Sequence, residues 1–280
     1  MVDPATAATA VVAGVASLFM AWSIGAGSSG STPFAPAVGA NAISVLRAGF
    51  VVGLLGLAGA TLQGANVTEA VGRELTLGAP ITPAAATVGL LIAGGLVAIG
   101  VGIGYPIATA FTVTGAMIGV GLALGGDPAW AKYRQIGALW LLTPPLGGGI
   151  AFAVAKVLRD ERTAESRLVP FLGAVVAVVA ANVQLSVLGA DRAGASIAAA
   201  IGRPLPLAPV GGVDPGPVLV SLAVAAAVAG LLYWDVRRDP EGGQQRLLLA
   251  LGGLVAFSAG GSQVGLAIGP LLPLLGDLPI

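Results

Sequence analysis

Long apolar stretches without a charged residue follow one another along the whole chain. The charge-free runs are Ala5 to Leu46, Ala48 to Thr68, Leu75 to Gly126, Gln135 to Ala155, Leu168 to Ala190, Pro215 to Trp234 and Leu247 to Gly276. A helix needs about 20 apolar residues to cross the hydrocarbon core of a bilayer, so the longest runs can hold two crossings, or a crossing and a hairpin. The pattern predicts roughly eight or nine hydrophobic segments, some of them re-entrant, in an all-α, multi-pass integral membrane protein.

Two of these stretches, at opposite ends of the chain, contain a polar, glycine-rich notch. The first notch reads SIGAGSSGSTPFAPAVGANAI over residues 23–43, and the second reads FSAGGSQVGLAIGP over residues 257–270. Backbone groups freed from a helix inside hydrocarbon find no water, so broken helices are expected only where they line a cavity. Corresponding pairs of interrupted segments point to the binding site of a transporter. The notches therefore predict two helix breaks that form a binding site.

Composition supports this class and excludes others. Charged residues make up 9% of the chain and the mean hydropathy is +0.94, whereas about 25% of the residues of a soluble domain are charged. The chain has no Cys and no His, which argues against disulfides, thiolate chemistry and a transition-metal site. The 13 basic and 13 acidic residues give no nucleic-acid signature. The spans hold no acid–base or nucleophile constellation, so we expect no enzyme and no cofactor.

The basic residues predict an orientation. Lys156, Arg159, Arg162 and Arg167 fall in one connection, and Arg237, Arg238 and Arg246 fall in another. The two apolar segments between these connections return the chain to the same side, so both connections can be cytoplasmic under the positive-inside rule. We therefore expect a multi-pass protein of the cell membrane, with the lipid bilayer as a partner.

The polar residues of the first notch have a functional and an ordinary interpretation. Ser28, Ser29, Ser31 and Thr32 can bind an anion together with the N–H groups of a helix end, and their clustering favours that role. Alternatively, each hydroxyl bonds back to a carbonyl of its own helix. Most intramembrane glycines are expected to serve close helix packing, but the notch glycines differ because polar residues accompany them. Asn182, Gln184 and Ser186 are expected to form hydrogen bonds between helices.

Four segments carry a resemblance to a known family. They are Trp22 to Ser28 followed by Phe34 to Gly39, Pro106 to Gly119, Trp140 to Gly149, and Phe257 to Leu271. In this order they resemble the signatures of the inorganic phosphate transporter (PiT) family, whose inverted repeats each carry a motif near Gly-Ala-Asn-Asp-Val-Ala-Asn-Ala. The last segment aligns without a gap to the family's second signature.

The chain departs from the family pattern at its polar positions. Ser28 and Gln263 stand where the signatures have Asp. The Asn positions hold Gly27 and Ser31 in the first copy, and Ser262 and Leu266 in the second. Phe111 replaces a His, and Gly56 replaces a Glu. Because the acids of the family resemble cation and phosphate ligands, a coupling cation, Na⁺ or H⁺, is implied by the resemblance alone and not by these residues.

The resemblance implies an organisation and a site. Residues 1–157 would form the first inverted repeat, residues 158–246 connecting transmembrane helices, and residues 247–280 the start of an incomplete second repeat, so that the chain resembles a divergent, C-terminally shortened member. The implied function is a permease for inorganic phosphate that works by alternating access, with the anion held between the two Gly/Ser-rich breaks. The substrate-binding candidates are Gly27, Ser28, Ser29, Ser31, Thr109, Ser262 and Gln263.

Other interpretations stay open at this point. The same scaffold suits sulfate or another oxyanion. The missing acids also fit a non-transporting membrane sensor or assembly partner. A homo-oligomer, or a second chain that completes the missing half of the repeat, is a further partner expected from the short second repeat.

Overall fold

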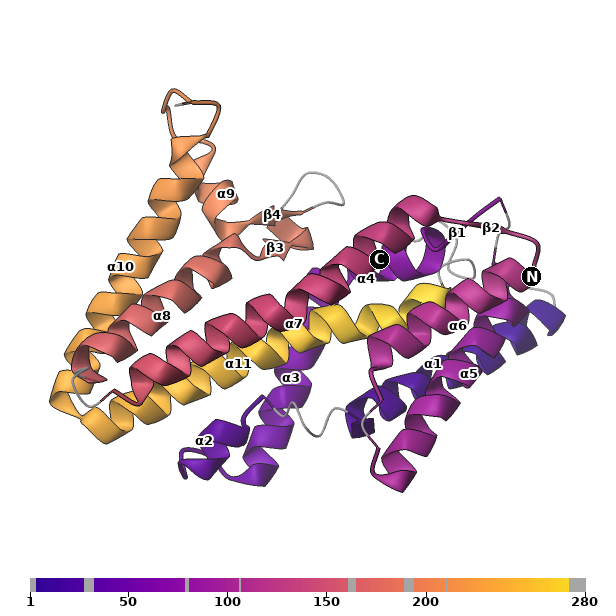
Figure 1. Cartoon of the computed structure of the whole chain (residues 1–280), viewed down its shortest axis with the longest axis horizontal. Coiled ribbons are helices and arrows are strands. Elements are labelled where there is room, and N and C mark those ends of the chain that lie inside the picture. Colours follow the sequence, from indigo (N-terminus) through magenta and orange to yellow (C-terminus); the bar gives the residue numbers. More distant parts are fainter. Residues whose placement is uncertain are drawn as a thin grey trace. The chain divides into compact units, whose positions relative to one another are not determined.

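The structure is a computed structural model that describes residues 4–27, 33–78, 81–105, 107–160, 165–188, 194–209 and 211–271. Its helices dominate the described chain (Figure 1). Within these ranges, six helices are long and apolar enough to cross a membrane: α1 (Pro4–Gly27), α3 (Val45–Gln63), α5 (Pro83–Ile103), α7 (Trp130–Leu158), α10 (Pro215–Arg238) and α11 (Pro240–Ile268). α6 (Thr109–Ala123) and most of α8 (Glu165–Asn182) are shorter apolar helices. The predicted all-α, multi-pass membrane fold is confirmed.

Short elements connect these helices. They are α2 (Ala35–Gly39), α4 (Ala65–Arg73), α9 (Ile197–Gly202) and the 3₁₀ turns η2 (Ser186–Leu188) and η3 (Gly269–Leu271). Two antiparallel strand pairs, each two residues long, join β1 (Thr76–Leu77) to β2 (Asp127–Pro128) and β3 (Gln184–Leu185) to β4 (Ala195–Ser196). The first pair ties the segment before α5 to the segment after α6. The run from Leu75 to Gly126 thus holds a helical hairpin, in line with the two crossings allowed by its length.

The chain divides into two compact units. The first comprises residues 1–32, 54–139 and 257–280, and the second comprises residues 33–53 and 140–256. Helices α3, α7 and α11 contribute residues to both units. Of the four segments that carry the family resemblance, Pro106 to Gly119 and Phe257 to Leu271 fall in the first unit, Trp140 to Gly149 falls in the second, and the first segment is divided between the two. The earlier division at residues 157 and 246, which follows the expected repeats, stays a prediction.

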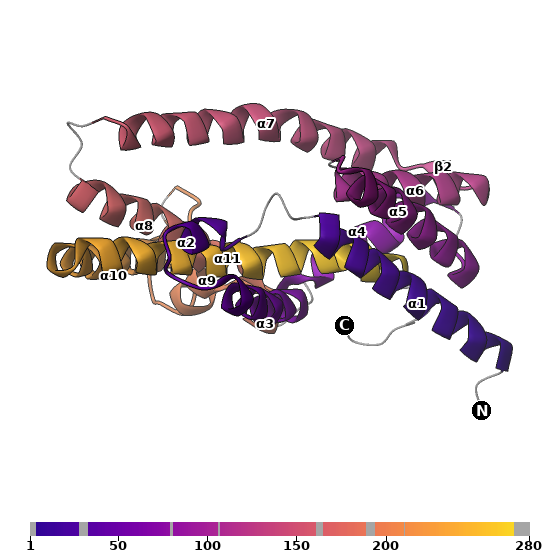
Figure 2. The same cartoon turned by 90° about the horizontal axis from the view of Figure 1, so that it is seen from below.

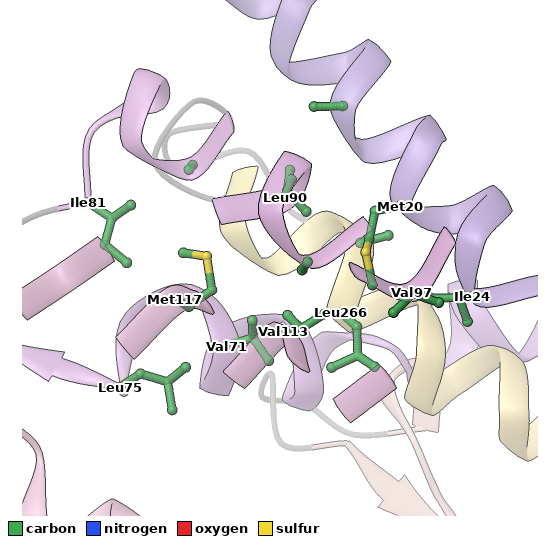
Figure 3. Packing of buried hydrophobic residues seen from close by; sticks show 14 residues of the cluster. Met20, Ile24, Val71, Leu75, Ile81, Leu90, Val97, Val113, Met117 and Leu266 are labelled. Carbon is green, nitrogen blue, oxygen red and sulfur yellow. The ribbon is translucent and has the colours of Figure 1, made fainter. Parts of the chain in front are cut away.

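The core of the first unit lies between α1, α5 and α6, with residues of α4 and α11 at its edge. Met20 of α1, Leu90 of α5 and Met117 of α6 are fully buried in this cluster (Figure 3). Glycines admit the large side chains: a Cβ on Gly94 would lie 2.9 Å from the ring of Phe19, and one on Gly89 would lie 2.8 Å from the sulfur of Met117. α1 and α5 therefore pack closely side by side (Figures 1 and 2).

Glycines also bring α3 and α11 into backbone contact within the first unit. The position of a Cβ on Gly59 overlaps the carbonyl oxygen of Phe257, and that of a Cβ on Gly260 overlaps the carbonyl of Gly56. Further along, a Cβ on Gly265 would lie 2.6 Å from the side chain of Val67 in α4. Small residues at such spacing let membrane helices approach until van der Waals contact holds them together.

The second unit contains an antiparallel pair formed by α8 and α10. Asn182 Nδ2, at the end of α8, donates to Ser221 Oγ near the start of α10 at 2.8 Å, which confirms the predicted interhelical role of Asn182. Gly173 of α8 faces Leu232 of α10. α9 completes this group, since Gly202 meets the backbone of Gly216. The start of α8 therefore lies beside the end of α10, as expected for a chain that returns to the same side.

The structure corrects one expectation about the notches. α11 runs without interruption from Pro240 to Ile268, through the second notch, and the α-helix gives way to a 3₁₀ turn only at Gly269. The break predicted over residues 257–270 is therefore absent from Phe257 to Ile268, and the α-helix ends only at the last two residues of the notch. The reason is the packing described above: Gly260 and Gly265 are helical positions that face α3 and α4. At the first notch, α1 ends at Gly27, and residues 28–32 lie outside the described ranges.

The contact between α3 and α11 predicts a difference between two neighbouring glycines. Gly59→Ala is expected to lower the free energy of unfolding by about 1–3 kcal/mol, because the added methyl group collides with the carbonyl of Phe257. The matched control is Gly56→Ala, whose Cβ would have no atom within 4 Å and should leave stability nearly unchanged. Reversible unfolding of the purified protein in mixed micelles measures both. Equal stability of the two variants would contradict the close contact.

Candidate functional site

The turn between α5 and α6 places Thr109 at a helix start. α5 begins at Thr82, whose hydroxyl accepts from the N–H of Ala85 at 3.3 Å, and ends at Gly104 in the left-handed region with φ of 70°. The N–H of Tyr105 bonds to the carbonyl of Gly100 at 2.8 Å, which closes the helix end as a Schellman motif. After an extended residue, Ala108, α6 starts at Thr109. Thr109 is therefore the first residue after a true break between two apolar helices.

Gln263 of α11 lies opposite this helix start. Thr109 Oγ1 donates to Gln263 Oε1 at 3.4 Å, across 154 residues of sequence, in a partly buried position. The contact is long, and so the hydrogen bond is weak. It nevertheless joins two of the candidate residues, one from the Pro106 to Gly119 segment and one from the second notch.

The pair retains capacity to bind a further group. With its carbonyl oxygen accepting from Thr109, the amide of Gln263 keeps two N–H donors. Ala108 provides no side-chain cap for the start of α6, so the first N–H groups of that helix are not satisfied by such a cap. Donors of these kinds bind oxyanions by hydrogen bonding without a formal charge.

The other candidates have different surroundings. Ser262 is exposed and donates to the carbonyl of Ala259 in its own helix at 3.2 Å, which is the ordinary arrangement of a membrane serine. Gly27 ends α1 against α5, where its Cβ would lie 3.2 Å from Val97. Ser28, Ser29 and Ser31 lie outside the described residues. The structure thus brings Thr109 and Gln263 together and does not bring Gly27 or Ser262 into contact with them.

Packing positions Gln263 along α11. Gly261 faces Gln63 of α3, with 2.7 Å between Gln63 Oε1 and the position of a Cβ on Gly261. On the other side of the bundle, Ser17 Oγ of α1 donates to the carbonyl of Ala267 at 2.9 Å. The sequence does not predict either contact, because neither Gln63 nor Ser17 carries a signal for a partner so distant in sequence. These contacts hold the last turns of α11 against α1 and α3.

Formal charge is kept away from the pair. The described parts of α1, α5, α6 and residues 257–271 contain no Asp, Glu, Lys or Arg. One ion pair of the first unit lies at the other end of α6, where Lys132 pairs with Glu74 and Tyr133 Oη donates to the carbonyl of Leu75 at 2.6 Å. The 15 residues of α6 separate this end from Thr109 by about 22 Å. Among the described residues no cluster of His, Cys, Asp or Glu could hold a metal ion.

Known proteins resemble the chain over most of its length. Residues 24–278 match the phosphate transporter family. The chain is 26% identical over 312 residues to the chloroplastic inorganic phosphate transporter 2-1 of Arabidopsis thaliana, a match that covers 93% of this chain and 49% of that protein. It is 32% identical over 160 residues to a sodium-dependent phosphate transporter of Plasmodium falciparum, with 53% and 24% covered.

A solved structure shares the fold. It belongs to a protein named the sodium-dependent phosphate transporter, with a TM-score of 0.74 and 22% sequence identity, and the match covers 96% of this chain and 67% of that chain. The chain therefore has the fold of a helical transporter. It spans 49% of the length of the Arabidopsis protein and 24% of the Plasmodium protein, so it corresponds to about half or less of these curated relatives.

The contact between Thr109 and Gln263 can be tested without any assumption about function. In a double-mutant cycle of Thr109→Val and Gln263→Leu, we expect a coupling of about 0.6 kcal/mol, the average for hydrogen bonds between membrane helices. The control pairs Gln263→Leu with Thr112→Val, since the hydroxyl of Thr112 bonds to the carbonyl of Ala108 in its own helix at 3.0 Å. Unfolding in detergent measures the couplings. Additive effects in both cycles would contradict the contact.

Proposed function

The chain belongs to the phosphate transporter family, and from this premise we propose that it carries inorganic phosphate across a membrane. The observation that carries the proposal is the meeting of Thr109 with Gln263, which joins two family segments at a helix break inside apolar sequence. The names of the Arabidopsis and Plasmodium relatives support phosphate as the substrate. We place the protein in the cell membrane, the location suggested by the positive-inside pattern.

The proposed mechanism is alternating access around a neutral anion site. The amide N–H groups of Gln263 would donate to oxygen atoms of phosphate, and the hydroxyl of Thr109, whose proton goes to Gln263 Oε1 in this structure, would turn that proton to the anion. Gly27, Ser28, Ser29, Ser31 and Ser262 are further ligands predicted from sequence. Hydrogen bonds to an ionised acceptor are roughly twice as strong as those between neutral groups, so a few donors can hold an anion without an opposing charge. The second notch takes part through Gln263, on an unbroken helix, and not through a break.

A second oxyanion is a competing substrate. Ser28 and Gln263 replace family acids, and a neutral set of hydroxyl and amide donors accepts sulfate as readily as phosphate. Competition of unlabelled phosphate, sulfate and arsenate against labelled phosphate separates these substrates. A homo-oligomer or a second chain as partner, and a non-transporting role as sensor or assembly partner, stay predictions from the sequence.

The transport proposal predicts a loss of uptake on removal of the paired donors. In proteoliposomes, wild-type protein should take up labelled phosphate with saturation, and Thr109→Val and Gln263→Leu should each lower the initial rate roughly 10-fold or more. The reason is that a hydrogen bond to a charged group contributes about 1.5–3 kcal/mol. Thr112→Val, one turn further along α6, is the control and should keep the wild-type rate. Absence of saturable uptake of any oxyanion by the wild-type protein would refute transport itself.

The neutral character of position 263 predicts how coupling to a cation can be introduced. Gln263→Asp places a carboxylate where the family signature has one, and sodium prefers oxygen ligands with negative charge. We therefore expect phosphate uptake by this variant to rise several-fold when sodium replaces choline at fixed pH. Gln263→Asn has the same size without the charge and should not gain this response. A response shared by both variants would show that the charge at position 263 does not govern coupling.

A further inference from the structure

The end of α10 presents two arginines on aromatic rings. The guanidinium carbon of Arg238 lies 3.8 Å from the ring centre of Trp234, and that of Arg237 lies 5.3 Å from the ring centre of Tyr233. Arg237 Nη1 also donates to Tyr233 Oη at 2.9 Å. Each pair is spaced four residues apart, so the pairs form two adjacent stripes on one side of the helix. Cation–π contact holds both guanidinium groups in defined positions.

The acidic groups of this helix end lie on a different side and have their own partner. Asp235 and Asp239 are also four residues apart, on the side of the helix end that faces α11 and not on the side of the two arginines. Arg246 of α11 binds both oxygens of Asp235 at 2.7 Å and reaches Asp239 at 3.3 Å. Val236 is buried and packs against Gly243 of α11. Arg237 and Arg238 are exposed, and within the described part of the chain neither forms an ion pair.

Three features place this helix end at a membrane surface. α10 is a 24-residue apolar helix whose charged residues are confined to its last turn. Trp234 and Tyr233 are 54% and 44% exposed, as is usual for the aromatic belt at the level of the lipid headgroups. The start of α8 lies beside the end of α10 (Figure 1), so Arg167, in the first turn of α8, belongs to the same end of this helix pair as Arg237. All these residues belong to the second unit.

We propose that Tyr233, Trp234, Arg237 and Arg238 form a binding site for the headgroup of an anionic phospholipid. The guanidinium groups match the oxygens of a phosphodiester bidentately, and the exposed faces of the aromatic rings lie against the glycerol and upper acyl region. The site goes beyond the proposed transport function and uses none of its residues. A lipid is favoured over free phosphate because the arginines stand on the outer, aromatic side of an apolar helix, where the acyl chains of a bound lipid find a place.

Native mass spectrometry of the intact protein with phosphatidylglycerol and phosphatidylcholine tests the site. Wild-type protein should retain phosphatidylglycerol in preference to phosphatidylcholine. Arg237→Gln combined with Arg238→Gln should weaken phosphatidylglycerol binding roughly 25-fold, about 5-fold for each arginine near a membrane surface. Arg203→Gln is the control, since Arg203 caps α9 beside the opposite end of α10 and its loss removes one positive charge elsewhere in the unit.

Two further measurements test the site independently of the double arginine variant. Trp234→Leu leaves every charge in place, so it should weaken phosphatidylglycerol binding without removing it, even if the double arginine variant fails to fold. Excess inorganic phosphate should not displace the lipid. The proposal is overturned if the double variant and Arg203→Gln retain phosphatidylglycerol equally, if Trp234→Leu binds as the wild type does, or if free phosphate competes as strongly as the lipid.

Discussion

Helices surrounded by hydrocarbon are held together by direct contact, because apolar lipid provides no hydrophobic driving force between them. In this chain that contact depends on glycine. Gly94 admits Phe19 between α1 and α5, Gly59 meets the backbone of Phe257 between α3 and α11, and Gly202 meets Gly216 between α9 and α10. The 44 glycines of the sequence therefore include many that set helix spacing. The position of Gln263 depends on the same contacts, since Gly260 and Gly265 fix the turns on either side of it.

This role of glycine explains which part of the fold could be predicted from sequence. Charge-free runs located the helices, and the length of the run from Leu75 to Gly126 indicated more than one segment there. The prediction of a helix break was wrong for residues 257–268. In water a glycine costs a helix about 1 kcal/mol, but in hydrocarbon the loss of backbone hydrogen bonds costs more, so a helix continues through glycines that face a neighbour. Composition alone does not distinguish a helix break from a row of glycines that pack against a neighbouring helix.

The candidate site could be predicted in part for a related reason. Family resemblance selected Thr109 and Gln263 separately, but their contact joins residues 154 apart and depends on the crossing of helices. The acceptor of each hydroxyl proton depends on the position of the residue in its helix. Ser262, Thr112 and Ser23 bond to carbonyls of their own helices, whereas Thr109, at the first position of α6, has no preceding turn of helix to accept its proton. The hydroxyl of Thr109 is therefore free to reach across to α11, as the hydroxyl of Ser17 in α1 also does.

The replacement of a signature acid by Gln263 links the proposed substrate to the proposed coupling. A carboxylate beside an oxyanion in a medium of low dielectric constant repels it strongly, so an acid there requires a cation to balance the charge. An amide removes the repulsion and, with it, the reason for the cation, and it adds N–H donors that the carboxylate lacks. The same argument applies to Ser28 in the first signature. Under the proposed function, replacement of both signature acids therefore preserves anion binding. Replacement of only one would leave the other carboxylate beside the anion without a balancing charge.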